Sequence, residues 1–125
     1  MKSAGNDDSG YSVDVLALGI QIRAWGFWDA ALATNFVAAV LDAIRANPQR
    51  SWLTLDASQL KPQRDEGQAA LRELVETTAK LGQRGELIVA NAITKMQLAR
   101  IIREARANTW TMRGATSSPP ADGGA

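Results

Sequence analysis

Apolar and polar residues alternate along two short stretches near the start of the chain. Apolar side chains occupy every second position over residues 11–15 and again over residues 20–24, with Gly19 between the two stretches. A period of two is typical of a β-strand that buries one face, and an isolated glycine indicates a bend. The pattern therefore predicts two neighbouring strands.

Three later stretches have apolar residues at spacings of three and four, which is typical of amphipathic helices. They predict helices over residues 29–46, 65–81 and 94–105, and Asn47-Pro48 ends the first of them. The residues expected on the buried helix faces are Ala33, Phe36, Val37, Val40, Leu41, Ile44, Leu71, Leu74, Val75, Thr78, Leu81, Leu98, Ile101, Ile102 and Ala105.

Polar residues indicate where these helices begin. Asp29 is predicted to be the N-cap of the first helix, because an aspartate side chain accepts hydrogen bonds from the free amides there. Asp65 and Gln68 have the three-residue spacing of a capping box, and so do Thr94 and Gln97. The spacing predicts that the second helix begins near Asp65 and the third near Thr94.

Three further stretches, residues 51–55, 87–90 and 110–112, favour β-structure. The nearly all-apolar stretch 87–90 predicts a strand that is covered on both faces. The resulting order is β-β-α-β-α-β-α-β, and the alternation of strands and helices predicts parallel neighbours joined by right-handed crossovers. We therefore expect one α/β domain with a mixed sheet of four to five strands and about three helices.

The two ends of the chain are poor in large apolar residues. Residues 1–10 are rich in Gly, Ser and Asp, and residues 113–125 are rich in Gly, Ser and Pro. Such segments cannot offset their ordering entropy by burial. We therefore expect a flexible amino terminus over 1–10, the domain over 11–112 and a disordered tail over 113–125.

Composition narrows the possible chemistry. The 125 residues include no histidine and no cysteine, which excludes Ser-His-Asp triads, Cys/His dyads, disulfides and thiolate or imidazole zinc sites. A net charge of +1 does not favour a dedicated nucleic-acid binder, and no apolar stretch is long enough to span a bilayer. We expect a cytoplasmic protein that is not an enzyme and holds no cofactor.

A longer motif resembles a known family. The stretch 53–67 is similar to the central signature of STAS domains, the family named for sulfate transporters and anti-sigma-factor antagonists, with Asp56 and Gly67 at the required separation. The turn Gly26-Phe-Trp-Asp29 and the stretch 81–105 are similar to its flanking motifs. The resemblance covers residues 13–112 and implies a single STAS-like, SpoIIAA-like domain.

The family's phosphorylation motif is replaced in this chain. Where STAS domains have Asp-Ser-Ser-Gly, the sequence reads Arg64-Asp65-Glu66-Gly67, so Glu66 stands at the position equivalent to the phosphorylated serine. Glutamate carries one negative charge, against about −1.5 to −2 for phosphoserine. The two acids either mimic a phosphorylated state or only cap the helix and complement its dipole.

The resemblance implies a docking face for a protein partner. Its expected residues are Ser58, Lys61, Arg64, Asp65, Glu66 and Gly67, with Phe27 and Asp29 beside them. The implied partners are an anti-sigma factor, a kinase-like ATPase or other STAS subunits. Alternatives are the binding of a lipid or small apolar ligand in a cavity, and a degenerate STAS oligomerisation module.

Aromatic and basic residues suggest further contacts. Trp28 and Trp52 are expected in the core, whereas Trp25 and Phe27 would be partner anchors if they were exposed. The third predicted helix carries four cations against Glu104 alone, which indicates a solvated face or a site for an acidic partner, a lipid headgroup or RNA. These cations are Lys95, Arg100, Arg103 and Arg106.

Overall fold

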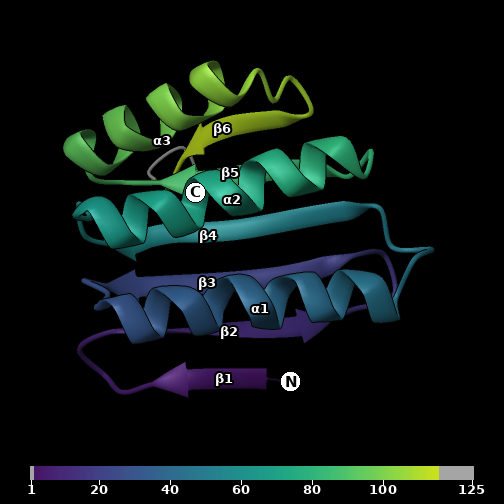
Figure 1. Ribbon diagram of the computed structural model, residues 1–125, viewed down its shortest axis with the longest axis horizontal. Helices are drawn as coiled ribbons and strands as arrows, with labels where there is room; N and C mark the ends of the chain where they lie inside the picture. The colour runs from purple at the N-terminus through teal and green to yellow at the C-terminus, as the bar shows by residue number, and fades with distance from the viewer. Residues whose placement is uncertain (1, 116–125) are drawn as a thin grey trace, which may run out of the picture.

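Six strands form one sheet in the order in which they occur along the chain (Figure 1). The computed structural model describes residues 2–115. The strands are β1 (Lys2–Gly5), β2 (Gly10–Val15), β3 (Ile20–Gly26), β4 (Trp52–Leu60), β5 (Arg84–Val89) and β6 (Trp110–Gly114). The helices are α1 (Ala30–Ala46), α2 (Asp65–Lys80) and α3 (Ala92–Ala105).

The three helices cover the same face of the sheet (Figure 1). β1, β2 and β3 pair antiparallel, whereas β3, β4, β5 and β6 pair parallel. Each parallel crossover is right-handed and moves to the next strand in the same direction, so every connecting helix is brought to one side. The expected α/β fold with a mixed sheet and three helices is confirmed.

The opposite face of the sheet has no helix over it among residues 2–115. Along β4, Leu53 and Leu55 are buried toward the helices, while Thr54 and Asp56 on the open face remain partly exposed. Ile88 of β5 lies on this open face and is only half-buried. The expectation that residues 87–90 are covered on both faces is therefore wrong.

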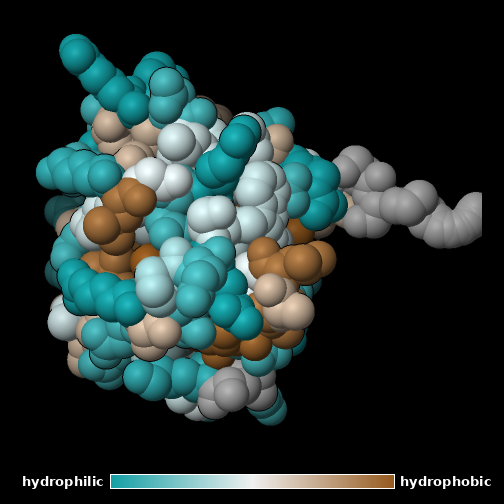
Figure 2. All heavy atoms as spheres, turned by 90° about the vertical axis from the view of Figure 1, so that its right-hand side faces the viewer, coloured by the Kyte–Doolittle hydropathy of each residue, from teal (hydrophilic) through white to brown (hydrophobic). Residues whose placement is uncertain are grey.

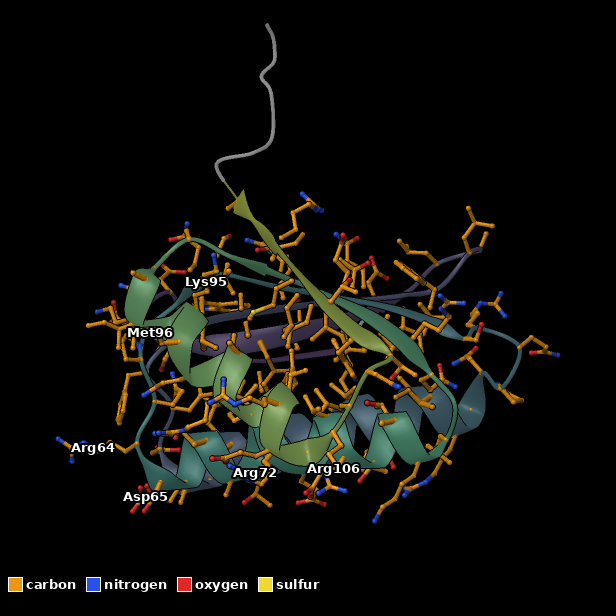
Figure 3. All side chains as sticks on the ribbon, turned by 90° about the horizontal axis from the view of Figure 1, so that it is seen from above. Arg64, Asp65, Arg72, Lys95, Met96 and Arg106 are labelled. Carbon is orange, nitrogen blue, oxygen red and sulfur yellow. The ribbon has the colours of Figure 1, made fainter. Side chains whose placement is uncertain are left out.

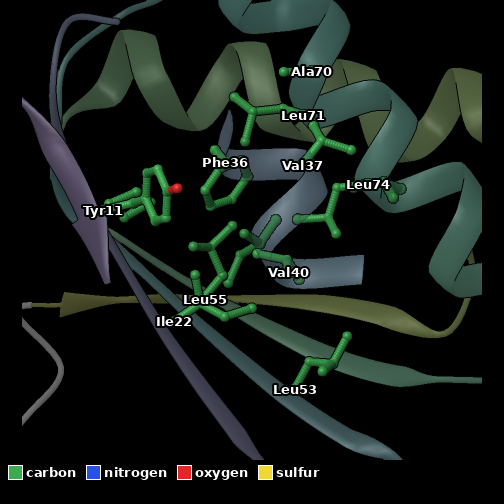
Figure 4. Close-up of a cluster of buried hydrophobic side chains, with 14 of the residues drawn as sticks. Tyr11, Ile22, Phe36, Val37, Val40, Leu53, Leu55, Ala70, Leu71 and Leu74 are labelled. Carbon is green, nitrogen blue, oxygen red and sulfur yellow. The ribbon is translucent and has the colours of Figure 1, made fainter. Parts of the chain in front are cut away.

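The core lies between the helices and the sheet, where it is filled by aromatic and aliphatic side chains (Figure 4). Phe36 packs against Trp28 and Tyr11, with ring centroids 4.5 Å and 5.5 Å apart. The Trp28 indole NH donates to the Gly10 carbonyl oxygen at 3.1 Å, so its polar atom is satisfied inside the core. Ile22 and Leu55 close this layer from the sheet side.

Most of the predicted buried positions are confirmed; among the large side chains, Leu81 and Trp52 are exposed and Ile102 is only partly buried. The predicted face of α1 is buried throughout, and on α2 the burial runs through Thr78. Leu81 is 52 % exposed because α2 has already ended at Lys80. Trp52 is 43 % exposed because β4 directs it to the open face, so its expected place in the core is wrong.

The boundaries of several strands differ from those predicted; β3, for example, runs to Gly26, and β5 spans Arg84–Val89. Residues 2–5, expected to be flexible, form β1, which gives the sheet six strands instead of four or five. β4 continues past Asp56 to Leu60, and β6 continues to Gly114. Of the disordered tail expected over 113–125, residues 116–125 lie outside the described residues.

Trp25 explains why the amino-terminal segment is attached to the sheet. Its indole NH donates to the Asn6 carbonyl oxygen at 2.7 Å. A Cβ atom at Gly10 would lie 2.7 Å from the Trp25 ring, so the ring packs directly on that backbone. Trp25 lies on the open face of the sheet, holds the β1–β2 connection and is only partly exposed.

The helix caps are confirmed for α1 alone. The Asp29 carboxylate accepts from the Leu32 amide at 2.8 Å. α2 has Arg64 at its N-cap with no side-chain hydrogen bond, and α3 begins after Asn91, whose side chain accepts from the amides of residues 93 and 94. The capping boxes predicted at Asp65/Gln68 and Thr94/Gln97 are therefore wrong.

Large exposed apolar side chains lie near the two ends of the parallel strands. Leu16, Leu18 and Trp52 line a groove of about 150 Å³ at the amino ends. Figure 2 faces this end, where apolar side chains interrupt the polar surface. Phe27 and Met96 are exposed at the carboxyl ends. The two ends are thus both available for contact with other molecules.

An ion pair joins α2 to α3 on the outer surface. The Arg72 guanidinium donates to Glu104 Oε1. This hydrogen bond, helped by the positive charges of Arg72, Arg100 and Arg103, lowers the pKa of Glu104 below its ordinary value of 4.5. The ionised carboxylate is therefore the form that the fold favours.

The lowered pKa of Glu104 predicts a pH-dependent contribution to stability. A carboxylate whose pKa is depressed by folding stabilises the fold above its unfolded pKa, and this stabilisation is lost as the pH falls through the folded value. We expect Glu104→Gln to lower the free energy of unfolding in urea at about pH 7, with the difference shrinking below about pH 4.5. Glu73→Gln, at an exposed site without an ion pair among residues 2–115, is the control. A difference between Glu104→Gln and the wild type that stayed constant down to about pH 3 would contradict this assignment.

Candidate functional site

The candidate site lies where the parallel strands end. β3, β4 and β5 end at Gly26, Leu60 and Val89, and short connections lead from there into α1, α2 and α3. Crevices at the carboxyl ends of parallel strands are the usual place for binding sites in α/β folds. Figure 3 shows Arg64, Asp65, Lys95 and Met96 at this end of the molecule.

One buried side chain connects the first two of these connections. The Gln63 carboxamide is 3 % exposed and lies between the β3–α1 and β4–α2 segments. Its Oε1 accepts from the Trp28 amide at 3.1 Å, and its Nε2 donates to the carbonyl oxygens of Gly26 and Lys61 at 3.0 and 2.7 Å. Both ends of the amide are thus satisfied by backbone groups.

The backbone of Gln63 is held from α2 and α3. The Gln63 amide donates to Gln97 Oε1 at 2.8 Å, and the Gln63 carbonyl accepts from Gln97 Nε2 at 3.0 Å and from Gln68 Nε2 at 2.8 Å. We call these bonds, with those of the side chain, the Gln63 network. The network joins the segments that precede α1 and α2 to the helices α2 and α3.

Two further bonds brace the same segments. The Lys61 amide donates to the Gly26 carbonyl at 3.1 Å. The buried Thr94 hydroxyl donates to the Leu60 carbonyl at 3.0 Å. The end of β4 is therefore fixed to both the end of β3 and the first turn of α3.

Gly67 is required by the Gln63 side chain. A Cβ atom at this position would lie 2.5 Å from Gln63 Oε1 and 2.8 Å from Gln63 Cβ. The first turn of α2 can approach the network this closely only without a side chain. The predicted site glycine is therefore buried and has a packing role.

Phe27 and Arg64 form the exposed part of the site. The Phe27 ring is 41 % exposed, and the Arg64 guanidinium carbon lies 5.6 Å from its centroid. This separation is within the range of a cation–π contact. Lys61 is exposed on the segment between β4 and α2. The surface therefore combines an aromatic ring with two cations.

The acids beside this pair are free within the described chain. Asp65 and Glu66 are exposed in the first turn of α2, where the helix dipole favours negative charge. Among residues 2–115, no hydrogen bond or ion pair holds either carboxylate. Glu66 also lines a groove of about 540 Å³ between α1 and α2. Its charge is thus available to a bound molecule.

Two predicted site residues have other roles in the structure. Ser58 belongs to β4, not to the loop, and its hydroxyl donates to Asp56 Oδ1 at 2.6 Å on the open face of the sheet. The Asp29 carboxylate is used in capping α1. The structure brings together Phe27, Lys61, Arg64, Asp65, Glu66 and Gly67, and it separates Ser58, within β4, from them.

Sequence reasoning missed the residues that position the site. A glutamine in a polar loop gives no sign that it is buried, so Gln63 and its bond to Gln97 could be found only from the fold. Ile93 and Met96, in contrast to Gln63, could have been identified from the sequence. They are 59 % and 71 % exposed because they fall outside the buried stripe of α3, and apolar residues outside such a stripe indicate an exposed apolar surface.

The described residues contain no cluster of three or more acidic side chains placed to bind a metal ion. Within the same range, no helix has the length and apolar character needed to cross a membrane.

No protein-family model matches this chain, and no curated protein matches its sequence.

The Gln63 network predicts a large effect from one exchange. Gln63→Ala would leave the Trp28 amide and the Lys61 carbonyl without a partner and the Gly26 carbonyl with the Lys61 amide alone, and each unpaired buried group costs about 1–3 kcal/mol. We expect the free energy of unfolding, measured in urea, to fall by about 1–3 kcal/mol. The exposed Gln59→Ala, four residues earlier, should change it by less than about 0.5 kcal/mol. Equal effects of the two exchanges would show that the network does not carry this stability.

Proposed function

We propose that this protein binds a regulatory protein through the surface at the carboxyl ends of β3 and β4. We call this the docking surface and define it by Phe27, Lys61, Arg64 and Glu66. The observation that carries the proposal is the exposed Phe27–Arg64 pair, mounted on segments that the Gln63 network holds in place. Aromatic and arginine side chains are the residues most often dominant in protein interfaces.

Rigidity of the docking surface supports binding. The segments that carry Phe27 and Arg64 are joined by buried hydrogen bonds, so little conformational freedom is lost when a partner binds. The polar groups of the docking surface are the cations of Lys61 and Arg64 and the carboxylate of Glu66. None of them is a nucleophile activated by a neighbouring base. Such a surface recognises shape and charge and performs no covalent chemistry.

The class of partner is taken from the resemblance to STAS domains. That resemblance rests on the stretch 53–67 and its flanking motifs, and the order of strands and helices is compatible with it. It favours an anti-sigma factor, a kinase-like ATPase or another STAS subunit in the cytoplasm. The exposed Lys61 and Arg64 would meet acidic groups of that partner.

Glu66 would give the docking surface a constant charge. It occupies the position equivalent to the phosphorylated serine of STAS domains and has no bonded partner among residues 2–115. A glutamate side chain has no hydroxyl group, so a serine kinase cannot change its charge. Partner choice would then follow from the fold itself.

Binding of a lipid in an internal cavity finds less support. The largest side chains between helices and sheet are closely packed, and Trp28, Phe36 and Leu74 are at most 1 % exposed. An apolar ligand site needs an open space of about 300 Å³ or more inside that layer. The packing around these residues leaves the docking surface as the better supported site.

The docking surface predicts a selective loss of one partner. With tagged protein and mass spectrometry, we expect capture of a protein of one of the three partner classes from a cytoplasmic extract. Phe27→Ala and Arg64→Ala should each raise its dissociation constant about 30-fold, as expected for hot-spot residues that contribute about 2 kcal/mol. Leu18→Ala and Arg84→Ala, exposed at the opposite end of the sheet near the amino ends of the parallel strands, are the matched controls and should leave binding unchanged. Indifference of the captured protein to both site exchanges would refute the proposed surface.

The replaced motif predicts insensitivity to a serine kinase. Incubation with ATP and the kinase of the captured complex should place no phosphate on residues 64–67, because this segment has no hydroxyl group. Phosphopeptide mapping makes the measurement, and Glu66→Ser provides the control in which the acceptor is restored. Failure of Glu66→Ser to accept phosphate would argue against the STAS alignment at this position.

A further inference from the structure

α3 has an outward face that no other element covers among the described residues. Its buried side is formed by Thr94, Leu98 and Ile101. The opposite side carries four cations and two aliphatic side chains, all exposed, and we call it the α3 basic face. Its residues are Ile93, Lys95, Met96, Arg100, Arg103 and Arg106.

The charge of this face is largely uncompensated. Glu104, the acidic residue of α3, is bound to Arg72 of the neighbouring helix. Arg100 donates to the neutral Gln68 Oε1 at 2.6 Å. No ion pair among residues 2–115 neutralises Lys95, Arg103 or Arg106. The face therefore attracts anions.

The aliphatic residues of the same face project from the end of the helix. Met96 is 71 % exposed and Ile93 is 59 % exposed, and both lie near the start of α3. They line a groove of about 360 Å³ together with Gln97, Arg100 and Arg103. Figure 3 shows Lys95 and Met96 together at the start of α3 and Arg106 at its other end.

We propose that the α3 basic face binds the surface of an anionic lipid bilayer. Lys95, Arg100, Arg103 and Arg106 would contact lipid phosphates, and Ile93 and Met96 would enter the interfacial layer between headgroups and acyl chains. The charge complementarity of four cations with an anionic leaflet carries the proposal. The exposed aliphatic side chains favour a bilayer over an acidic protein, because fluid acyl chains can surround Ile93 and Met96 and fill the groove beside them without a surface of matching shape.

This binding is peripheral and independent of the docking surface. It uses α3, whereas the docking surface uses the segments before α1 and α2. A protein held in this way would keep Phe27 and Arg64 at the boundary of the membrane. Failure of either proposal leaves the other standing, because their decisive exchanges share no residue.

Vesicle flotation tests the proposal with the full chain. Vesicles of phosphatidylcholine with about 30 % phosphatidylglycerol should carry the protein, and pure phosphatidylcholine vesicles should carry at least about 10-fold less. Binding should weaken as salt rises, because the headgroup attraction is screened within a Debye length. Lys95→Glu/Arg103→Glu should lower binding at least about 10-fold, and Ile93→Ser/Met96→Ser about 3-fold or more.

Two matched controls separate this face from general charge and exposure. Arg45→Glu/Lys80→Glu makes the same change in net charge on exposed sites of α1 and α2 and should retain at least half of the binding. Leu18→Ser, at a 91 % exposed leucine, is the control for the aliphatic exchange and should also bind normally. Circular dichroism should show every variant folded; a variant that is not folded is replaced by its single exchanges.

Three results would overturn the proposal. The first is absence of binding to the anionic vesicles. The second is an equal loss of vesicle binding in Lys95→Glu/Arg103→Glu and Arg45→Glu/Lys80→Glu, which would show that net charge alone causes the binding. The third is full displacement of the protein by polyglutamate together with no effect of Ile93→Ser/Met96→Ser. The third would assign the face to an acidic protein instead.

Discussion

The arrangement of the candidate site depends on one buried amide. Gln63 is buried, and a buried polar group without a hydrogen bond lowers the free energy of unfolding. The Gln63 side chain avoids this cost because it is paired entirely with backbone groups of the segments before α1 and α2. The positions of Phe27 and Arg64 follow from that pairing. Gly67 follows as well, because the helix that carries Glu66 must approach the Gln63 side chain without a Cβ atom.

The direction of the chain through the sheet decides where functional residues gather. Successive strands from β3 to β6 add on the same side, and right-handed crossovers then place all helices on one face and all their amino termini at one end. Docking residues, helix dipoles and the start of α3 consequently lie close to each other. The same geometry leaves the other face open, which is why Trp52 and Ser58 are exposed to different degrees instead of buried.

The chain has no histidine and no cysteine, and residues 64–67 contain no serine. The two proposals therefore rest on the shape and charge of exposed surfaces. The docking surface offers an aromatic ring, two cations and a constant carboxylate, and the α3 basic face offers four cations with two aliphatic anchors. The roles proposed for both surfaces require only shape and charge. Together, the two proposals describe a protein that holds a regulatory partner at a membrane without chemical modification of its own.

The sequence by itself determined the fold class, the helices and most of the core. Periodicity depends on which face of each element meets the others, so the stripes of α1 and the strand of residues 20–24 could be read directly. It also indicated Phe27 and the 64–67 segment as a candidate surface. Only the tertiary structure decided that β1 joins the sheet, that Trp25 fastens it, that Ser58 lies apart and that Gln63 connects four segments. These features depend on contacts between residues distant in sequence, and local patterns contain no record of such contacts.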